Sequence, residues 1–197
     1  MKSFFVGIAG PSCSGKTTLV KALIDKVKFD FELIHLDDYW DRDFKPPLIN
    51  GYKNRELPEN LKLDLLFLHL QELKSGKSVE IPYRAFEVED EKRIVQPKKI
   101  IFVEGFLLFY KKEIGDSFDF KIYIDLSDEE IVKRGTERNR SNKNDEFYYR
   151  NIVISEYKKY GLPAKKEADL ILNGEKDVNE NVEVVLSKIA NFKSLFR

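Results

Sequence analysis

A glycine-rich segment near the start of the chain carries the clearest chemical signal. Residues 10–17 read Gly-Pro-Ser-Cys-Ser-Gly-Lys-Thr, which fits G-x-x-x-x-G-K-[ST] at every fixed position. Glycines let backbone N–H groups converge on phosphate oxygens, a lysine adds a cation for the β and γ phosphates, and a threonine hydroxyl can bind Mg²⁺. We therefore predict a site for ATP and Mg²⁺ formed by Gly10, Ser12, Cys13, Ser14, Gly15, Lys16, Thr17 and Thr18.

Two carboxylates stand at the ends of predicted strands. Asp37 follows an apolar run at residues 31–36, and Glu104 follows another at residues 99–103. In open parallel sheets, ligands bind beyond the carboxyl ends of the strands, so both acids should face the phosphate loop. Phosphoryl transfer to a hydroxyl needs a group that takes the acceptor proton and a carboxylate that positions hydrated Mg²⁺. We assign Asp37 as the catalytic base and Glu104, with Thr17, to the metal; Asp38 could exchange roles with Asp37.

The elements that must position these residues alternate along the chain. Apolar runs of strand length are followed by segments of helical periodicity, which predicts an α/β fold with a mostly parallel sheet of about five strands flanked by helices. The predicted strands are residues 4–9, 31–36, 99–103, 120–124 and 168–172, and the predicted helices are residues 17–27, 61–73, 127–140, 145–160 and 182–196. Residues 41–60 are rich in Pro, Asn, Gly and charge, and we interpret them as a functional covering loop.

Composition limits the class of protein. With 197 residues, 42% of them hydrophobic and 35% charged, the chain is expected to form one globular domain over residues 1–197. Lys plus Arg and Asp plus Glu both number 34, so no broad cationic surface for nucleic acid is expected. No apolar run approaches the roughly 18 residues of a membrane span. The single cysteine excludes an intrachain disulfide, and we expect a cytoplasmic protein.

Three segments together resemble the uridine kinase and nicotinamide riboside kinase family of P-loop nucleoside kinases. They are the phosphate loop, residues 35–40 (His-Leu-Asp-Asp-Tyr-Trp) and residues 103–109 (Val-Glu-Gly-Phe-Leu-Leu-Phe). Residues 54–58 (Asn-Arg-Glu-Leu-Pro) are also similar to a uridine kinase segment that opens with Asn-Phe-Asp-His-Pro. The resemblance implies a P-loop kinase fold with a lid. It also implies an activity that moves the γ-phosphate of ATP, with Mg²⁺, to the 5′-hydroxyl of a ribonucleoside such as uridine or cytidine.

The same resemblance implies residues for the acceptor and the transferred phosphate. Glu56 would hydrogen-bond the ribose hydroxyls, and Tyr83 or Phe86 would lie near the base. Arg134 and Arg138 lie on the helix that leads into the lid, at about residues 134–148. We expect Arg134 to bind the cofactor and Arg138 to meet the transferring phosphate, because closing arginines stabilise the charge spread over that group. The alternative for both is a solvated helix face.

Some assignments stay open at this point. Tyr39 and Trp40, beside the acidic pair, could stack on a substrate ring or anchor the loop, and we count Tyr39 among the candidate substrate-binding residues. His35 and His69, which fall in a predicted strand and a predicted helix, are expected to serve packing.

The acceptor and the reaction class also have alternatives. The histidine by which uridine kinases read the pyrimidine is missing after Tyr83, so nicotinamide riboside is an alternative acceptor. Because related folds phosphorylate other alcohols, pantothenate, glycerate or a phosphorylated sugar are further alternatives. Residues 142–145 spell the N-K-x-D pattern of GTP-binding switch proteins, but they follow a charged run and no Asp-x-x-Gly follows a predicted strand. We interpret that match as coincidence. The sequence gives no indication of the oligomeric state.

Overall fold

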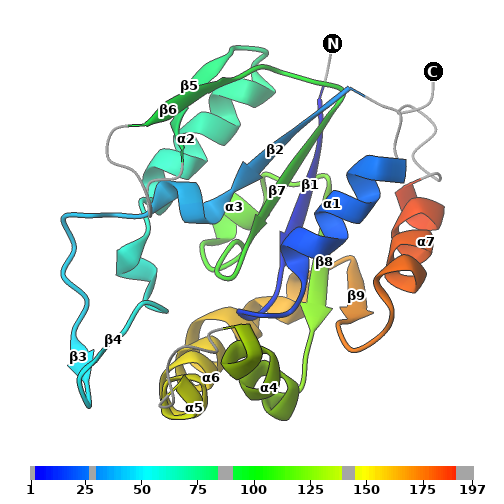
Figure 1. The fold of residues 1–197 in the computed structure, drawn as a ribbon. Helices are drawn as coiled ribbons and strands as arrows, with labels where there is room; N and C mark the ends of the chain where they lie inside the picture. Colours follow the sequence, from blue (N-terminus) through cyan, green and yellow to red (C-terminus); the bar gives the residue numbers. More distant parts are fainter. Residues whose placement is uncertain (1–2, 27–29, 84–90, 139–144, 190–197) are drawn as a thin grey trace.

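A parallel sheet forms the centre of the protein. The computed structural model describes residues 3–26, 30–83, 91–138 and 145–189. The strands of the sheet are, in chain order, β1 (Phe4–Ala9), β2 (Phe31–His35), β7 (Ile100–Gly105), β8 (Phe120–Asp125) and β9 (Leu170–Asn173). Their spatial order is β2-β7-β1-β8-β9, and every pair is parallel (Figure 1). The predicted α/β fold, with about five strands flanked by helices, is confirmed.

The pairing register brings the predicted chemistry to one edge of the sheet. The last residue of β1, Ala9, lies opposite Gly105 on β7, and His35 at the end of β2 lies opposite Glu104. The carboxyl ends of β1, β2 and β7 are therefore neighbours. The phosphate loop begins directly after β1, so it emerges beside both predicted carboxylates.

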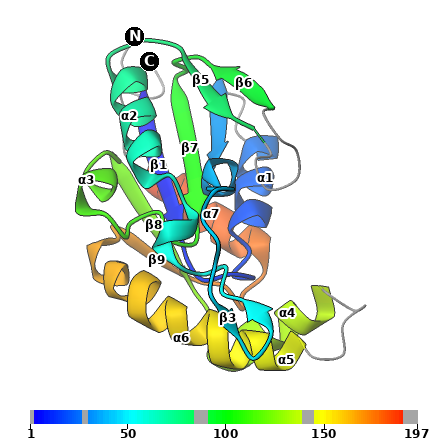
Figure 2. The same cartoon turned by 90° about the vertical axis from the view of Figure 1, so that its left-hand side faces the viewer.

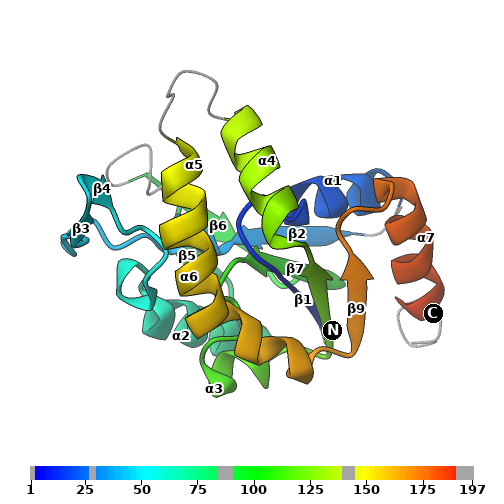
Figure 3. The ribbon, with the colours of Figure 1, turned by 90° about the horizontal axis from the view of Figure 1, so that it is seen from below.

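Two apolar layers cover the sheet, because successive strand residues point to opposite faces. Helices α1 (Lys16–Lys26) and α7 (Val178–Ile189) pack on the face that carries Val6 and Ile8 (Figures 1 and 3). Helix α2 (Leu63–Lys74) packs on the opposite face, against Phe5 and Ile101. A strand buried on both faces needs apolar residues throughout, which is why these strands read as continuous apolar runs.

The remaining helical segments lie beyond the edge of the sheet that carries the phosphate loop or connect its elements. They are η1 (Leu36–Tyr39), η2 (Pro58–Asn60), α3 (Lys112–Gly115), α4 (Asp128–Arg138), α5 (Asp145–Tyr148), the π turn η3 (Tyr149–Val153), α6 (Ile154–Glu156), the π turn η4 (Tyr157–Gly161) and η5 (Leu162–Glu167). The predicted helix at 145–160 is thus a continuous helical run with two widened turns. It runs beside α4 (Figure 3), where a Cβ on Gly135 would lie 2.4 Å from the Tyr149 ring.

The bounds of the predicted helices differ from the structure by a few residues. Helix α4 begins at Asp128, and Ser127 before it accepts the backbone N–H of Glu130 with its Oγ atom at 3.4 Å. The Ser127 backbone N–H and hydroxyl both donate to Glu175, while the Glu130 carboxylate accepts from Arg134. The last helix begins at Val178 rather than at residue 182, and residues 190–196 of that prediction lie outside the described residues.

Two antiparallel hairpins were not predicted. The expected loop at 41–60 contains β3 (Leu48–Ile49) and β4 (Tyr52–Lys53), joined by Asn50 and Gly51 with φ of +48° and +83°. Such left-handed pairs favour an Asn-Gly turn. The second hairpin pairs β5 (Val79–Pro82) with β6 (Lys92–Val95). Figure 2 shows the β3–β4 hairpin beside α5, where the rings of Tyr52 and Phe147 stack at 5.7 Å. No helix in the described part of the chain has the length and apolar character of a membrane span.

Candidate active site

The loop between β1 and α1 has the backbone shape of a phosphate cradle. Gly10, Cys13 and Gly15 have positive φ angles of 153°, 67° and 90°. A Cβ on Gly10 would lie 2.5 Å from the Ile124 carbonyl oxygen, so only glycine fits there. The Ser14 hydroxyl oxygen is buried and receives no hydrogen bond from the described residues.

Lys16 folds back onto this loop. Its ammonium group donates to the carbonyl oxygens of Gly10 at 3.1 Å and Pro11 at 2.9 Å. The loop therefore holds a buried cation at its centre, together with a buried hydroxyl that has capacity for another partner. Both are groups that an anion placed in the loop would satisfy.

Glu104 joins the start of α1 to the end of β2. Its Oε1 atom accepts the Thr17 hydroxyl at 2.9 Å and lies 2.7 Å from His35 Nδ1. Burial alone would raise the pKa of Glu104, but the His35 hydrogen bond and the charge of Lys16 outweigh it and hold the pKa below its usual range. The same hydrogen bond raises the pKa of His35. His35, which was expected to serve packing, thus also contacts a predicted site residue through its ring.

The two adjacent aspartates separate into an accessible and a buried one. Both lie on η1, but the Asp37 side chain is exposed to solvent whereas Asp38 is 5% exposed. Surrounding protein atoms partly desolvate the Asp37 carboxyl and raise its pKa, and the negative charge of Glu104 adds to the effect. Lys16 is also close enough to act on Asp37 electrostatically. Asp37, and not Asp38, is therefore the acid that an incoming molecule can reach.

Glu56 lies against the phosphate loop although it comes from the covering segment. It is 9% exposed, and Ser12 donates its hydroxyl to Glu56 Oε2 at 3.2 Å. The Tyr148 hydroxyl lies 3.5 Å from Oε1. Burial, with a contribution from the charge of Asp37, raises the pKa of Glu56 to about 7.

A buried amide holds the Glu56 backbone in place. The Asn54 side chain accepts the Glu56 N–H at 3.2 Å and donates to Glu156 Oε1 at 2.8 Å. Asn54 and Tyr148 lie in segments that the sequence singles out, but no role was expected for them, and no motif included Glu156. Tyr148 and Glu156 lie about a hundred positions from their partners (92 and 102), and no motif spacing connects them.

The predicted lid arginines lie at different places on α4. Arg134 donates to the Gly174 carbonyl oxygen at 2.9 Å and to Glu130 at 2.8 Å, which ties it to the turn after β9. Arg138 is exposed and lies close enough to Cys13 for its charge to oppose the burial that raises the pKa of that thiol. The predicted lid at 134–148 is described at both ends, but residues 139–144 lie outside the described residues, as does most of the N-K-x-D match at 142–145.

The aromatic residues predicted to contact the substrate lie at different places. The expectation that Tyr39 binds substrate is wrong, because its side chain is fully buried and its hydroxyl lies 2.9 Å from His69 Nδ1. Tyr39 therefore anchors η1 to α2. Tyr83 lies at the end of the β5–β6 hairpin with the Arg93 guanidinium 5.8 Å from its ring centre. Phe86 lies outside the described residues.

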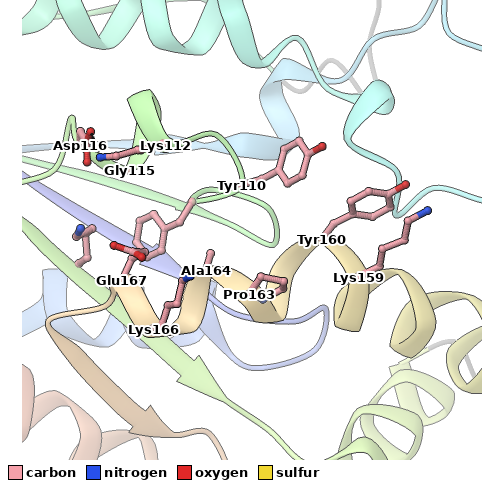
Figure 4. Close-up of a pocket in the computed structure, with 12 residues that line it drawn as sticks. Tyr110, Lys112, Gly115, Asp116, Lys159, Tyr160, Pro163, Ala164, Lys166 and Glu167 are labelled. Atoms are coloured by element: carbon pink, nitrogen blue, oxygen red, sulfur yellow. Dashed lines mark hydrogen bonds and ion pairs between the residues drawn. The ribbon is translucent and has the colours of Figure 1, made fainter.

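A hollow with a volume of about 290 Å³ lies away from these groups. It is lined by residues of α3, η4 and η5, including Tyr160 on η4, and by Tyr110 before α3 (Figure 4). Lys112 on its rim is paired with Asp116 at 2.6 Å. None of the predicted site residues lines it, whereas Ser12 and Glu56 line a smaller recess beside the phosphate loop. We therefore locate the candidate site at the phosphate loop, where the polar groups described above come together, and not at this hollow.

Comparisons with known proteins identify the family of the chain. The family model for the phosphoribulokinase / uridine kinase family matches residues 5–180. A uridine kinase of Clostridium tetani is 34% identical over 183 residues, which cover 87% of each chain, and one of Brevibacillus brevis is 33% identical over 177 residues, which cover 85% of this chain and 83% of that one. A solved structure of a possible uridine kinase from Bacillus stearothermophilus covers 88% of this chain and 90% of its own, with a TM-score of 0.63 and 22% identity, so the two share a fold. This chain belongs to the phosphoribulokinase / uridine kinase family.

Proposed function

We propose that this protein transfers the γ-phosphate of ATP, with Mg²⁺, to the 5′-hydroxyl of a ribonucleoside of the uridine or cytidine type. Its family makes it a phosphotransferase with an alcohol as acceptor. The proposal adds the donor, the metal and the acceptor. The observation that carries it is that an accessible acid, Asp37, and a second acid, Glu56, both lie beside a loop that holds Lys16.

The donor half of the proposal is supported by the polar groups that the loop gathers. The buried Ser14 hydroxyl and the Lys16 ammonium, which now bonds two loop carbonyls, are suited to phosphate oxygens. The loop residues from Gly10 to Thr18 would hold ATP, with Arg134 at the turn after β9. Thr17 and Glu104 would hold Mg²⁺, which when bound neutralises charge on the phosphates.

The acceptor half rests on the two acids. The raised pKa of Asp37 makes it a better proton acceptor for an alcohol than an ordinary aspartate, because basicity rises with pKa. Glu56 can accept hydrogen bonds from ribose hydroxyls once it is ionised. Arg138 would approach the transferring phosphate from the lid, which we assign to residues 134–148 of a single domain.

The choice of a pyrimidine ribonucleoside follows the relatives. The similar proteins of Clostridium tetani and Brevibacillus brevis are named uridine kinases, at 34% and 33% identity. Among the described residues, no contact identifies where the base of the acceptor would bind. The test therefore also includes nicotinamide riboside, pantothenate and glycerate.

A turnover panel tests the proposal. Purified protein is incubated with Mg²⁺-ATP and, separately, with uridine, cytidine, adenosine, nicotinamide riboside, pantothenate and glycerate, and the phosphorylated products are identified by mass. We expect uridine or cytidine 5′-monophosphate, and no product from 5′-deoxyuridine, which lacks the accepting hydroxyl. Turnover of an acid such as pantothenate with no nucleoside product would refute the acceptor class. Tight GTP binding without any product would indicate a nucleotide switch instead.

A further inference from the structure

His35 contacts the candidate site but has no role in the function proposed above. It is the last residue of β2, and Glu104 lies directly opposite it on β7. Its Nδ1 atom lies 2.7 Å from Glu104 Oε1. An ionised carboxylate can only accept hydrogen bonds, so Nδ1 must carry the proton of this short contact. The ring of His35 therefore donates to the acid that we assign to the metal.

The contacts of Glu104 are unevenly divided between its two oxygens. Oε1 receives both the His35 ring and the Thr17 hydroxyl, the latter at 2.9 Å. Among the described residues, no hydrogen bond is made to Oε2. Two donors from two different elements, β2 and α1, hold Oε1 in place more firmly than a single donor would.

We propose that His35 is a positioning residue, which holds Glu104 Oε1 together with Thr17 and so leaves Oε2 for the water shell of the Mg²⁺ that accompanies the nucleotide. This inference rests on the donor half of the proposed function and is independent of the acceptor. A threonine hydroxyl can donate its hydrogen to Glu104 while a lone pair of its oxygen binds a cation, so the arrangement persists when the metal site is filled.

The imidazole ring suits this task better than a longer side chain. Glu104 is 6% exposed, so an orienting donor must reach it within the folded site. Histidine offers a rigid N–H at a fixed distance from the backbone, and only two torsions must be fixed to aim it. Outer-shell donors of this kind typically change metal affinity by about 10–100-fold when they are removed.

Three substitutions at this position separate a positioning role from a structural one. His35→Leu removes the donor. His35→Asn places an amide N–H close to where Nδ1 lies, and His35→Gln places it one carbon farther along. Binding of a non-hydrolysable ATP analogue is measured by calorimetry without any acceptor, once with Mg²⁺ and once with EDTA. Electron paramagnetic resonance of Mn²⁺ then reports metal binding directly, in the presence of the analogue.

We expect His35→Leu to weaken Mg²⁺-dependent binding of the analogue by about tenfold or more, with unchanged affinity in EDTA. His35→Asn should restore most of the loss and His35→Gln less of it, and Mn²⁺ affinity should follow the same order. The role is overturned if His35→Leu binds as the wild type does, if the loss is equal in EDTA, or if His35→Asn is as weak as His35→Leu. If His35→Leu does not fold, the role is judged by the difference in Mg²⁺-dependent affinity for the analogue between His35→Asn and His35→Gln.

These outcomes stay separate from failure of the proposed function. A wild-type protein that binds the analogue but phosphorylates no nucleoside refutes the acceptor and leaves the role of His35 to be judged by its variants. A wild-type protein that binds no analogue at all refutes the donor half, and the role of His35 with it.

Discussion

Replacing the buried acid Glu56 by its neutral amide should stabilise the fold in alkaline solution. Glu56 is 9% exposed, and burial raises its pKa from the ordinary 4.5 to about 7. The folded protein therefore prefers Glu56 protonated. Above neutral pH it must hold a desolvated negative charge near Asp37, and Glu56→Gln removes that charge while keeping the shape of the side chain.

The sign and size of this change in the free energy of unfolding follow from the linkage between proton binding and folding. Between pH 4.5 and about 7 the folded state keeps the Glu56 proton that the unfolded state has released, so stability falls as the pH rises through this window. At 1.36 kcal/mol for each pH unit, the full difference corresponds to about 3 kcal/mol. Ser12 and Tyr148 lose the stronger hydrogen bonds that a carboxylate accepts, so we expect a net gain of about 2 kcal/mol at pH 8 and nearly none at pH 4.5.

Urea unfolding at pH 4.5, 6 and 8 measures this, because urea leaves the ionic strength unchanged. The quantity of interest is the free energy of unfolding of Glu56→Gln minus that of the wild type. Glu59→Gln, an exposed acid of the same segment, serves as the matched control and should give a difference near zero at each pH. A Glu56→Gln difference that stays constant from pH 4.5 to 8, or that favours the wild type at pH 8, would refute the reasoning.

Four further substitutions test the site and one correction. Lys16→Ala should lower turnover by at least about a hundredfold with an unchanged melting temperature, and a variant that keeps wild-type turnover contradicts the role of Lys16. Asp37→Asn should lower kcat on the order of a hundred- to ten-thousandfold while a binding titration shows ATP affinity intact; parallel losses in both count against a base. Glu104→Gln should raise the Mg²⁺ concentration needed for half-maximal turnover by about tenfold, which an unaltered Mg²⁺ titration would disprove. Tyr39→Phe should cost about 1–2 kcal/mol of stability, since His69 loses a buried partner, with turnover unaffected; lost turnover at full stability would restore Tyr39 to the substrate site.

The sheet could be predicted from sequence because its strands are buried on both faces. Such strands require continuous apolar runs, as in Phe4–Ala9, and these stand out against a charge-rich background. The hairpins carried weaker signals. In β6 the exposure alternates from Lys92 to Val95, but the residue types do not, because the apolar Ile94 is 65% exposed beside the buried Val95. The Asn50-Gly51 turn was a usable signal that the surrounding prolines and charges obscured.

The candidate site could be predicted from the residues that stand at the ends of strands. The wrong or missed assignments concern residues whose contacts depend on the direction of the side chain. Lys16, Thr17, Glu104 and Asp37 were expected at one edge because carboxyl ends of parallel strands meet there. Their functional roles stay predictions. Tyr39 was misjudged because η1 turns by about 120° per residue, so neighbours of an accessible Asp37 point into the core. His35 was missed because its contact requires the register between β2 and β7.

The helix after the lid shows why the surroundings of Glu56 lay beyond sequence reasoning. Tyr148 and Glu156 both reach the segment around Glu56, the first through Glu56 itself and the second through Asn54. In a regular α-helix, residues eight positions apart point about 80° away from each other, at 100° per residue. The π turn η3 (Tyr149–Val153) lies between them and absorbs one residue, which reduces the separation to about 20°. Both side chains then share one face. A periodicity of 3.6 residues cannot reveal this, because the inserted residue changes the phase of the helix without changing its composition.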